Sequence, residues 1–162
     1  SHDMAWWYAD PTRLENPLVQ AVTSAEVRVG YHGEPAAGFV TRWVHRAVAR
    51  REVRHASIKK LADAGVPILT GTDAGNPGTF LAYSLHRELA LLVDAGLTPM
   101  QALAASTTVA GEFMGRAWGL SEGDEGSVVL LDASPLDDIR NTEKISAVVH
   151  HGVVVDRAAL LN

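Results

Sequence analysis

The side chain best suited to chemistry in this sequence is the carboxylate of Asp73. It follows a short apolar run over residues 66–70 and lies in the glycine-rich stretch Gly71-Thr72-Asp73-Ala74-Gly75. The run is too short for a helix and follows Gly65, so it predicts a buried strand. In α/β folds, catalytic groups collect where parallel strands end. Asp73 is therefore the first candidate catalytic residue.

Two polar residues that follow Asp73 are candidate substrate-binding residues. Asn76 lies in the loop after it, and His86 lies in the helix expected next. Each has a plainer interpretation: Asn76 as a turn residue before proline, and His86 as a half-buried imidazole bonded to a backbone carbonyl. Asp73 itself could accept backbone N–H groups in an Asx turn. These residues alone leave the alternatives open.

Helical patterns lie on both sides of the predicted strand. One runs from about residue 39 to residue 64, and another covers residues 81–95. The sequence Thr98-Pro99-Met100-Gln101 is a capping box with proline at the first helical position, so it predicts the start of a third helix. A short fourth helix is expected over residues 109–114.

The two ends of the chain have other patterns. Residues 128–131 and 145–149 are rich in β-branched and leucine residues and predict strands. Residues 153–155 predict a third strand, joined to the second in a hairpin through His150-His151-Gly152. Near the N-terminus, the aromatic cluster of residues 6–8 needs a surface to bury against, and we expect it to anchor a core or an interface.

Composition excludes several classes of protein. The 162 residues suit one domain or a piece of a larger one, and 47% hydrophobic with 20% charged residues is typical of a packed protein. The net charge of −5 is spread along the chain, so we expect no nucleic-acid partner. The sequence has no cysteine, which excludes disulfides and thiolate metal sites. With no apolar run of membrane-spanning length and no signal pattern, we expect no membrane partner and a cytoplasmic location.

Three segments taken together resemble the C-terminal part of the metal-dependent amidohydrolase superfamily. The resemblance is to its branch of imidazolonepropionase-like and Xaa-Pro dipeptidase-like enzymes. The segments are residues 61–75, 86–103 and 123–136, with Gly152-Val153-Val154-Val155 after them. This resemblance implies an α/β fold, the C-terminal part of a (β/α)8 TIM barrel whose last strand is 66–70, plus strands of a small β-sandwich. Residues 1–118 would form the barrel segment and residues 119–162 the sandwich segment.

The resemblance also implies a chemistry for Asp73. In the superfamily, the aspartate that closes the last barrel strand binds a divalent metal, here expected to be zinc, and accepts a proton from the attacking water. A bound metal lowers the pKa of water and polarises the carbonyl under attack, and a carboxylate can act as base and then acid. The implied activity is hydrolysis of amide or cyclic amide C–N bonds in small molecules, including dipeptides.

The chain departs from the superfamily pattern in its metal ligands. That pattern has a His-x-His pair after the first strand and single histidines on later strands, but this sequence contains no His-x-His. One aspartate cannot hold a catalytic metal, because such sites need about three protein ligands. We therefore expect a C-terminal fragment that is inactive without the missing N-terminal barrel half or another copy of the chain. The alternative is a non-catalytic fragment that serves as a folding or assembly module.

Overall fold

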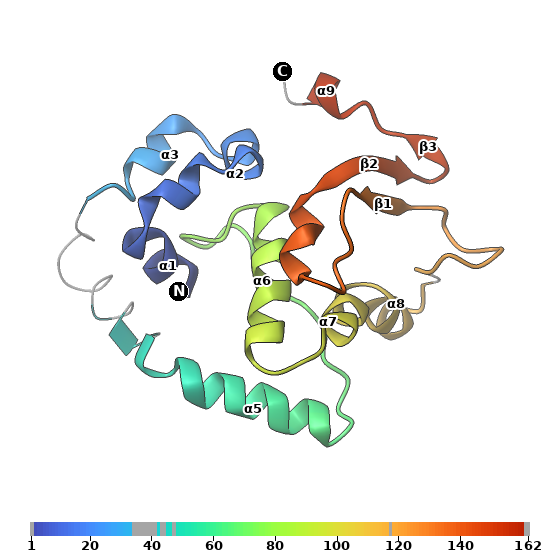
Figure 1. The fold of residues 1–162 in the computed structure, drawn as a ribbon, viewed down its shortest axis with the longest axis horizontal. Helices are drawn as coiled ribbons and strands as arrows, with labels where there is room; N and C mark the ends of the chain where they lie inside the picture. Colours follow the sequence, from blue (N-terminus) through green and yellow to red (C-terminus); the bar gives the residue numbers. More distant parts are fainter. Residues whose placement is uncertain (1, 34–41, 43–44, 47, 117, 161–162) are drawn as a thin grey trace. The chain divides into compact units, whose positions relative to one another are not determined.

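The computed structural model describes residues 2–33, 42, 45–46, 48–116 and 118–160 (Figure 1). The chain divides into two compact units. Unit 1 comprises Ser1–Ser57 and Thr72–Leu85, and unit 2 comprises Ile58–Gly71 and His86–Asn162. No helix in the described residues is long and apolar enough to cross a membrane.

Unit 1 begins with four short helices, α1 (His2–Ala9), η1 (Pro11–Glu15), α2 (Pro17–Val22) and α3 (Ala25–Val29). Short polar side chains start three of them. Asp10, Asn16 and Ser24 each accept a backbone N–H group from the first turn that follows, and proline comes first in η1 and α2. Such caps satisfy the N–H groups that a helix leaves unbonded at its start.

The core of unit 1 is aromatic. Trp7 is 1% exposed, and its ring centroid lies 5.1 Å from that of Phe80 and 5.8 Å from that of Tyr83. Leu14 and Val19, from η1 and α2, are also buried in this cluster. The prediction that the N-terminal aromatic residues need a surface is thus confirmed for Trp7, and the later stretch of unit 1 supplies that surface.

The helices that follow are α5 (Arg51–Asp63), α6 (Tyr83–Asp94), α7 (Pro99–Ser106) and α8 (Thr108–Met114). They confirm the helices expected near residues 81–95, 98–105 and 109–114. Helix α7 starts with the predicted capping box, in which the Thr98 side chain accepts the Gln101 N–H and the Gln101 side chain accepts the Thr98 N–H. Most of residues 39–47 of the first expected helix lie outside the described residues, and α5 is its later part.

The core of unit 2 is built from residues of α6, α7 and η2 (Ile139–Glu143). Its buried side chains are mostly small or aliphatic, and the residues are Leu89, Ala90, Leu92, Leu97, Ala102, Ala105 and Ile139. Ile58 and Ile68 pack against this cluster from outside it.

The strand expected over residues 66–70 is wrong as an element. The segment is extended, but no ladder joins it to a strand within the described residues. Its Ile68 packs on the unit 2 core, and the Thr70 N–H donates to the Ala105 carbonyl at 3.1 Å. The predicted burial is also wrong for its first residues: Val66 is 44% exposed, and residues 68–70 are only partly buried. A strand also needs a neighbouring strand to pair with.

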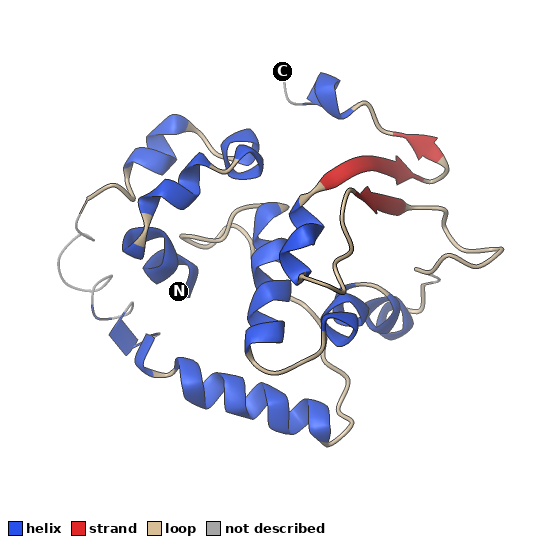
Figure 2. Cartoon of the chain, viewed as in Figure 1, coloured by secondary structure: helices blue, strands red, loops and turns tan. Residues whose placement is uncertain are grey.

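A sheet in the described residues contains β1 (Val128–Leu131), β2 (Ile145–His150) and β3 (Val153–Val154), in the order β1-β2-β3 (Figure 2). Both pairs are antiparallel, and a register irregularity lies between Leu130 and Leu131. The turn between β2 and β3 has positive φ at His151 and Gly152, as a tight hairpin requires. Helix α9 (Arg157–Leu160) follows. The three predicted strands and their hairpin are confirmed, whereas the division at residue 118 stays a prediction.

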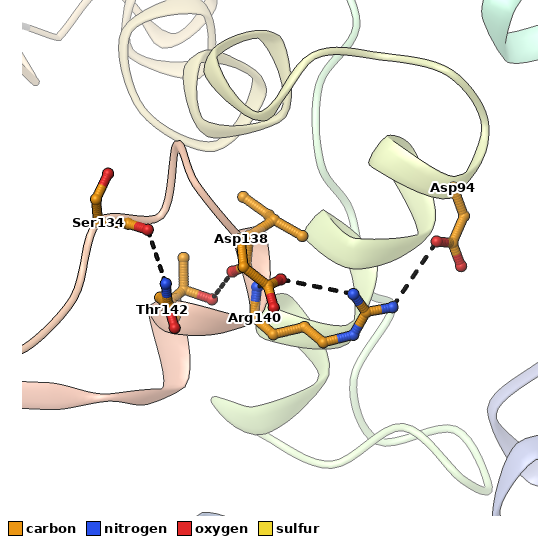
Figure 3. A network of polar contacts seen from close by, with 7 residues as sticks. Asp94, Ser134, Asp138, Arg140 and Thr142 are labelled. Atoms are coloured by element: carbon orange, nitrogen blue, oxygen red, sulfur yellow. Dashed lines mark hydrogen bonds and ion pairs between the residues drawn. The ribbon is translucent and has the colours of Figure 1, made fainter.

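A polar network surrounds η2 in unit 2 (Figure 3). The Arg140 guanidinium lies 3.5 Å from an Asp138 carboxylate oxygen and 3.9 Å from one of Asp94, at the end of α6. The Asn141 side chain donates to the Ser134 carbonyl at 2.8 Å, and the Thr142 hydroxyl donates to the Ile139 carbonyl at 2.9 Å. These bonds shape the connection between β1 and β2.

Candidate functional site

Asp73 opens a tight loop over residues 73–80, which we call the Asp73 loop. The backbone of Asp73 is left-handed, with φ 51°, a conformation that aspartate tolerates better than most residues. The Asn76 N–H donates to the Asp73 carbonyl at 3.4 Å, and the Thr79 N–H donates to the Asn76 carbonyl at 2.9 Å. The Thr79 hydroxyl also donates to the Asn76 carbonyl, at 2.6 Å. Two successive turns therefore bring Asn76 and Thr79 back toward Asp73.

The structure brings Asp73 and Asn76, two of the three predicted site residues, into direct contact. The Asn76 side-chain amide donates to the Asp73 carboxylate oxygen Oδ2 at 2.6 Å and to the Asp73 carbonyl at 3.2 Å. Asp73 is exposed, and its other carboxylate oxygen accepts no hydrogen bond from the described residues. One oxygen is thus held in place while the other can receive a proton or bind an ion.

The Asx-turn alternative for Asp73 does not describe this loop. In such a turn the carboxylate would accept the N–H of Gly75, two residues on. Here the Gly75 N–H donates to the Thr79 carbonyl at 3.3 Å. The amide that orients the carboxylate belongs to the Asn76 side chain. Whether Asn76 also contacts substrate stays a prediction.

Helix α1 supports the Asp73 loop within unit 1. The Trp7 indole N–H donates to the Gly78 carbonyl at 2.9 Å in a buried bond. Gly78 has φ 86°, and a Cβ added there would lie 2.7 Å from Met4 Cγ. The sequence predicted Trp7 as a buried anchor but not this bond, because no local pattern links residues 71 positions apart.

Glu88 anchors the chain just before the loop, within unit 2. Its carboxylate oxygen Oε1 accepts the Gly71 N–H at 2.8 Å. Sequence reasoning missed this contact, although Glu88 follows His86 by only two positions on α6. The bond fixes the end of the extended segment at Gly71.

His86 is half-buried on α6, and burial lowers the pKa of its imidazole. The carboxylate of Glu143 in η2 opposes part of that shift. A neutral imidazole can both donate and accept a hydrogen bond at neutral pH. His86 belongs to unit 2 and Asp73 to unit 1. A substrate-binding role for His86 stays a prediction.

The described residues fit a metal site only in part. Asp73 offers one carboxylate, and no group of three or more histidine, cysteine, aspartate or glutamate side chains that could hold a metal occurs in the described part of the chain. Because a catalytic metal needs about three protein ligands, these residues do not make a complete site.

Comparison with known proteins identifies the family. The sequence model of the amidohydrolase family matches residues 24–155. The chain belongs to the amidohydrolase family. It is also 41% identical over 63 residues to the imidazolonepropionase of Geobacillus kaustophilus (strain HTA426), covering 38% of this chain and 15% of that protein. The resemblance described from the three sequence segments is therefore confirmed.

The chain also resembles solved structures of hydrolases. The chain resembles a structure assigned as a prolidase from Bifidobacterium longum, with 33% identity and a TM-score of 0.57 over 66% of this chain and 29% of that one. It resembles phenylurea hydrolase B with 25% identity and a TM-score of 0.58 over 85% of this chain and 32% of that one. These neighbours imply a TIM-barrel-type fold. The chain spans about a third or less of the length of the proteins that it matches.

Proposed function

We propose that this chain forms the C-terminal segment of a metal-dependent amidohydrolase that hydrolyses amide or cyclic amide C–N bonds in small molecules, dipeptides included. The family match over residues 24–155 supports hydrolysis in general, and the names imidazolonepropionase and prolidase among its relatives suggest the substrate class. The segment is inactive alone in this proposal. The missing N-terminal barrel half, or another copy of the chain, completes the site.

The observation that carries the proposal is the exposed carboxylate of Asp73, with one oxygen fixed by Asn76 and the other open within the described residues. The open oxygen accepts a proton from water while the water oxygen bonds to the amide carbonyl carbon. The same proton then moves to the amide nitrogen as the C–N bond breaks. Asp73 thus ends the cycle as it began, as a carboxylate.

A divalent metal, with zinc as the first candidate, would supply Lewis-acid chemistry when bound, and Asp73 would be one of its ligands. The remaining ligands would come from outside the described residues, since these do not form a complete set.

The experiment measures hydrolysis of Xaa-Pro dipeptides, cyclic amides and aryl amides by the complete zinc-loaded protein that contains this segment. Asp73→Asn keeps the size of the side chain but removes the base, and we expect it to lower kcat by at least about 100-fold. The matched control is Asp63→Asn on α5, which removes only a surface ion pair with Lys59 and should leave kcat unchanged.

Full activity in Asp73→Asn would contradict the catalytic role. A complete protein that folds but hydrolyses none of these amides would favour the folding or assembly module instead.

A further inference from the structure

Two contacts at Gly78 join the Asp73 loop to helix α1. The Trp7 indole N–H donates to the Gly78 carbonyl at 2.9 Å, and Met4 occupies the space that a side chain at Gly78 would need. Residues 4 and 7 lie one turn apart on α1, so both contacts come from the same helix face. Helix α1 therefore holds the loop at Gly78 by a hydrogen bond and by close packing.

The Trp7 ring is itself held by aromatic neighbours. Trp7 is 1% exposed and packs against the rings of Phe80, the last residue of the loop, and Tyr83, which follows it. Burial makes the indole N–H dependent on its partner, because an unpaired buried donor is costly. The orientation of this donor, and with it the position of the Gly78 carbonyl, is thus fixed by the core of unit 1.

A continuous set of bonds leads from Gly78 to the carboxylate. Thr79, next in the chain, bonds the Asn76 carbonyl through its backbone N–H and through its hydroxyl, which also donates to the Asp73 carbonyl at 3.2 Å. The Asn76 amide in turn holds Asp73 Oδ2 at 2.6 Å. A shift of Gly78 would therefore be passed to the carboxylate through two short-range contacts.

We propose that Trp7 is a positioning residue for Asp73, acting through the Gly78 carbonyl and the Thr79–Asn76 contacts. This inference rests on the proposed function, since it concerns the residue that accepts the proton. Displacing a catalytic carboxylate by about 1 Å can lower the reaction rate by up to about 100-fold. Because Asp73 carries the proton transfers, we expect the effect to fall on kcat more than on KM.

The test replaces Trp7 in the complete zinc-loaded protein with 3-benzothienylalanine, which keeps the bicyclic ring but has sulfur in place of the N–H group. We expect kcat to fall about 10-fold, with KM within about twofold of the original value. The amide proton of Thr79 should exchange faster with solvent, because its turn is less well held. The control is the same replacement at Trp6, which packs edge-on against Trp7 in the same helix. It should change neither kcat nor the exchange rate of the Thr79 amide proton.

A double-mutant cycle separates this inference from the proposed function. If Trp7 acts through Asp73, the analogue should have no further effect on kcat in an Asp73→Asn background. Unchanged kcat and exchange in the Trp7 analogue, with activity still lost in Asp73→Asn, would overturn the positioning role and leave the proposed function intact. Activity that survives Asp73→Asn would overturn the proposed function itself, and the Trp7 role with it. Fast solvent exchange of the Trp7 indole proton in the unmodified protein would also overturn the positioning role.

Discussion

Gly78 is the residue at which the Asp73 loop leaves least room. A Cβ there would lie 2.7 Å from Met4 Cγ and 2.8 Å from the Met4 nitrogen, and φ is 86°. We expect Gly78→Ala to lower the free energy of unfolding by about 4 kcal/mol, since a strained backbone and an overpacked contact each cost about 1–3 kcal/mol. Urea unfolding measures this loss.

Gly75 offers the matched control for Gly78. It also has a positive φ, 107°, but apart from its two chain neighbours no described residue has an atom within 4 Å of the position of its Cβ. Gly75→Ala should therefore cost only the backbone part, about 1–3 kcal/mol. Equal losses at the two glycines would contradict the close packing of Met4 on the loop.

His86 should make stability depend on pH. Burial lowers the pKa of its imidazole in the folded protein below the ordinary value of 6.5, so the unfolded chain binds its proton first as the pH falls. Stability is then fully present above about pH 6.5 and is lost as the pH falls toward the folded pKa. We expect His86→Asn to remove this loss, as followed by urea unfolding across that range.

Glu143 provides a second check on His86. Its negative charge raises the pKa of the imidazole and opposes burial. Glu143→Gln should lower the His86 pKa further, which an NMR titration of the imidazole protons measures. A midpoint that rises in this variant, or an original midpoint above 6.5, would contradict the arrangement.

At the scale of elements, η2 allows a comparison of apolar and ionic contacts at adjacent residues. Ile139 is 3% exposed in the unit 2 core, while the Arg140 side chain is 62% exposed and pairs with Asp94 and Asp138. Ile139→Ala should lower the free energy of unfolding by about 2–5 kcal/mol. Arg140→Ala should cost less than about 1 kcal/mol, because exposed ion pairs are screened by water and salt.

Urea unfolding of both η2 variants, at low and high salt, checks this comparison. A larger loss for Arg140→Ala than for Ile139→Ala would mean that the polar network, not the apolar core, holds η2 in place.

Elements with local signals were predictable from the sequence. Helix α7 is specified by the reciprocal bonds of Thr98 and Gln101, three positions apart in the chain, and the hairpin by a two-residue turn at His151 and Gly152. The segment over residues 66–70 was predicted as a strand and is not one, because pairing depends on partners that apolar spacing does not reveal. Short-range sequence patterns were therefore sufficient to predict the elements whose hydrogen bonds join residues close in the chain.

The same distinction applies to the candidate site. Asp73 could be identified because a glycine-rich loop follows an apolar run. Asn76 could be identified as a nearby amide, but its bond to Asp73 depends on the left-handed backbone at φ 51°. Trp7 and Gly78 are 71 positions apart, and no periodicity connects them.

At the scale of the whole molecule, the number of metal ligands becomes testable. Asp73 is one carboxylate, and the described residues contain no group of three that could hold a metal. We expect the isolated 162-residue chain to bind no stoichiometric zinc at micromolar concentration, because a single carboxylate is a weak site. Equilibrium dialysis followed by elemental analysis measures this.

Asp73→Asn is the control for the zinc measurement. Any zinc that the isolated chain binds equally well with and without this carboxylate is held elsewhere. One equivalent of tightly bound zinc that is lost in Asp73→Asn would show that this chain carries a complete set of ligands, contrary to the expectation.

The bond from Trp7 to Gly78 also has a consequence for the order of folding during synthesis. Unit 1 is discontinuous, since Ile58–Gly71 between its two stretches belongs to unit 2. Its aromatic core cannot close until a partner 71 residues downstream has left the ribosome, about 4–14 s later at about 5–20 residues per second. During that interval the Trp7 ring is not covered by Phe80 or Tyr83. The Trp7 side chain is therefore expected to stay uncovered on the nascent chain until Phe80 and Tyr83 follow it.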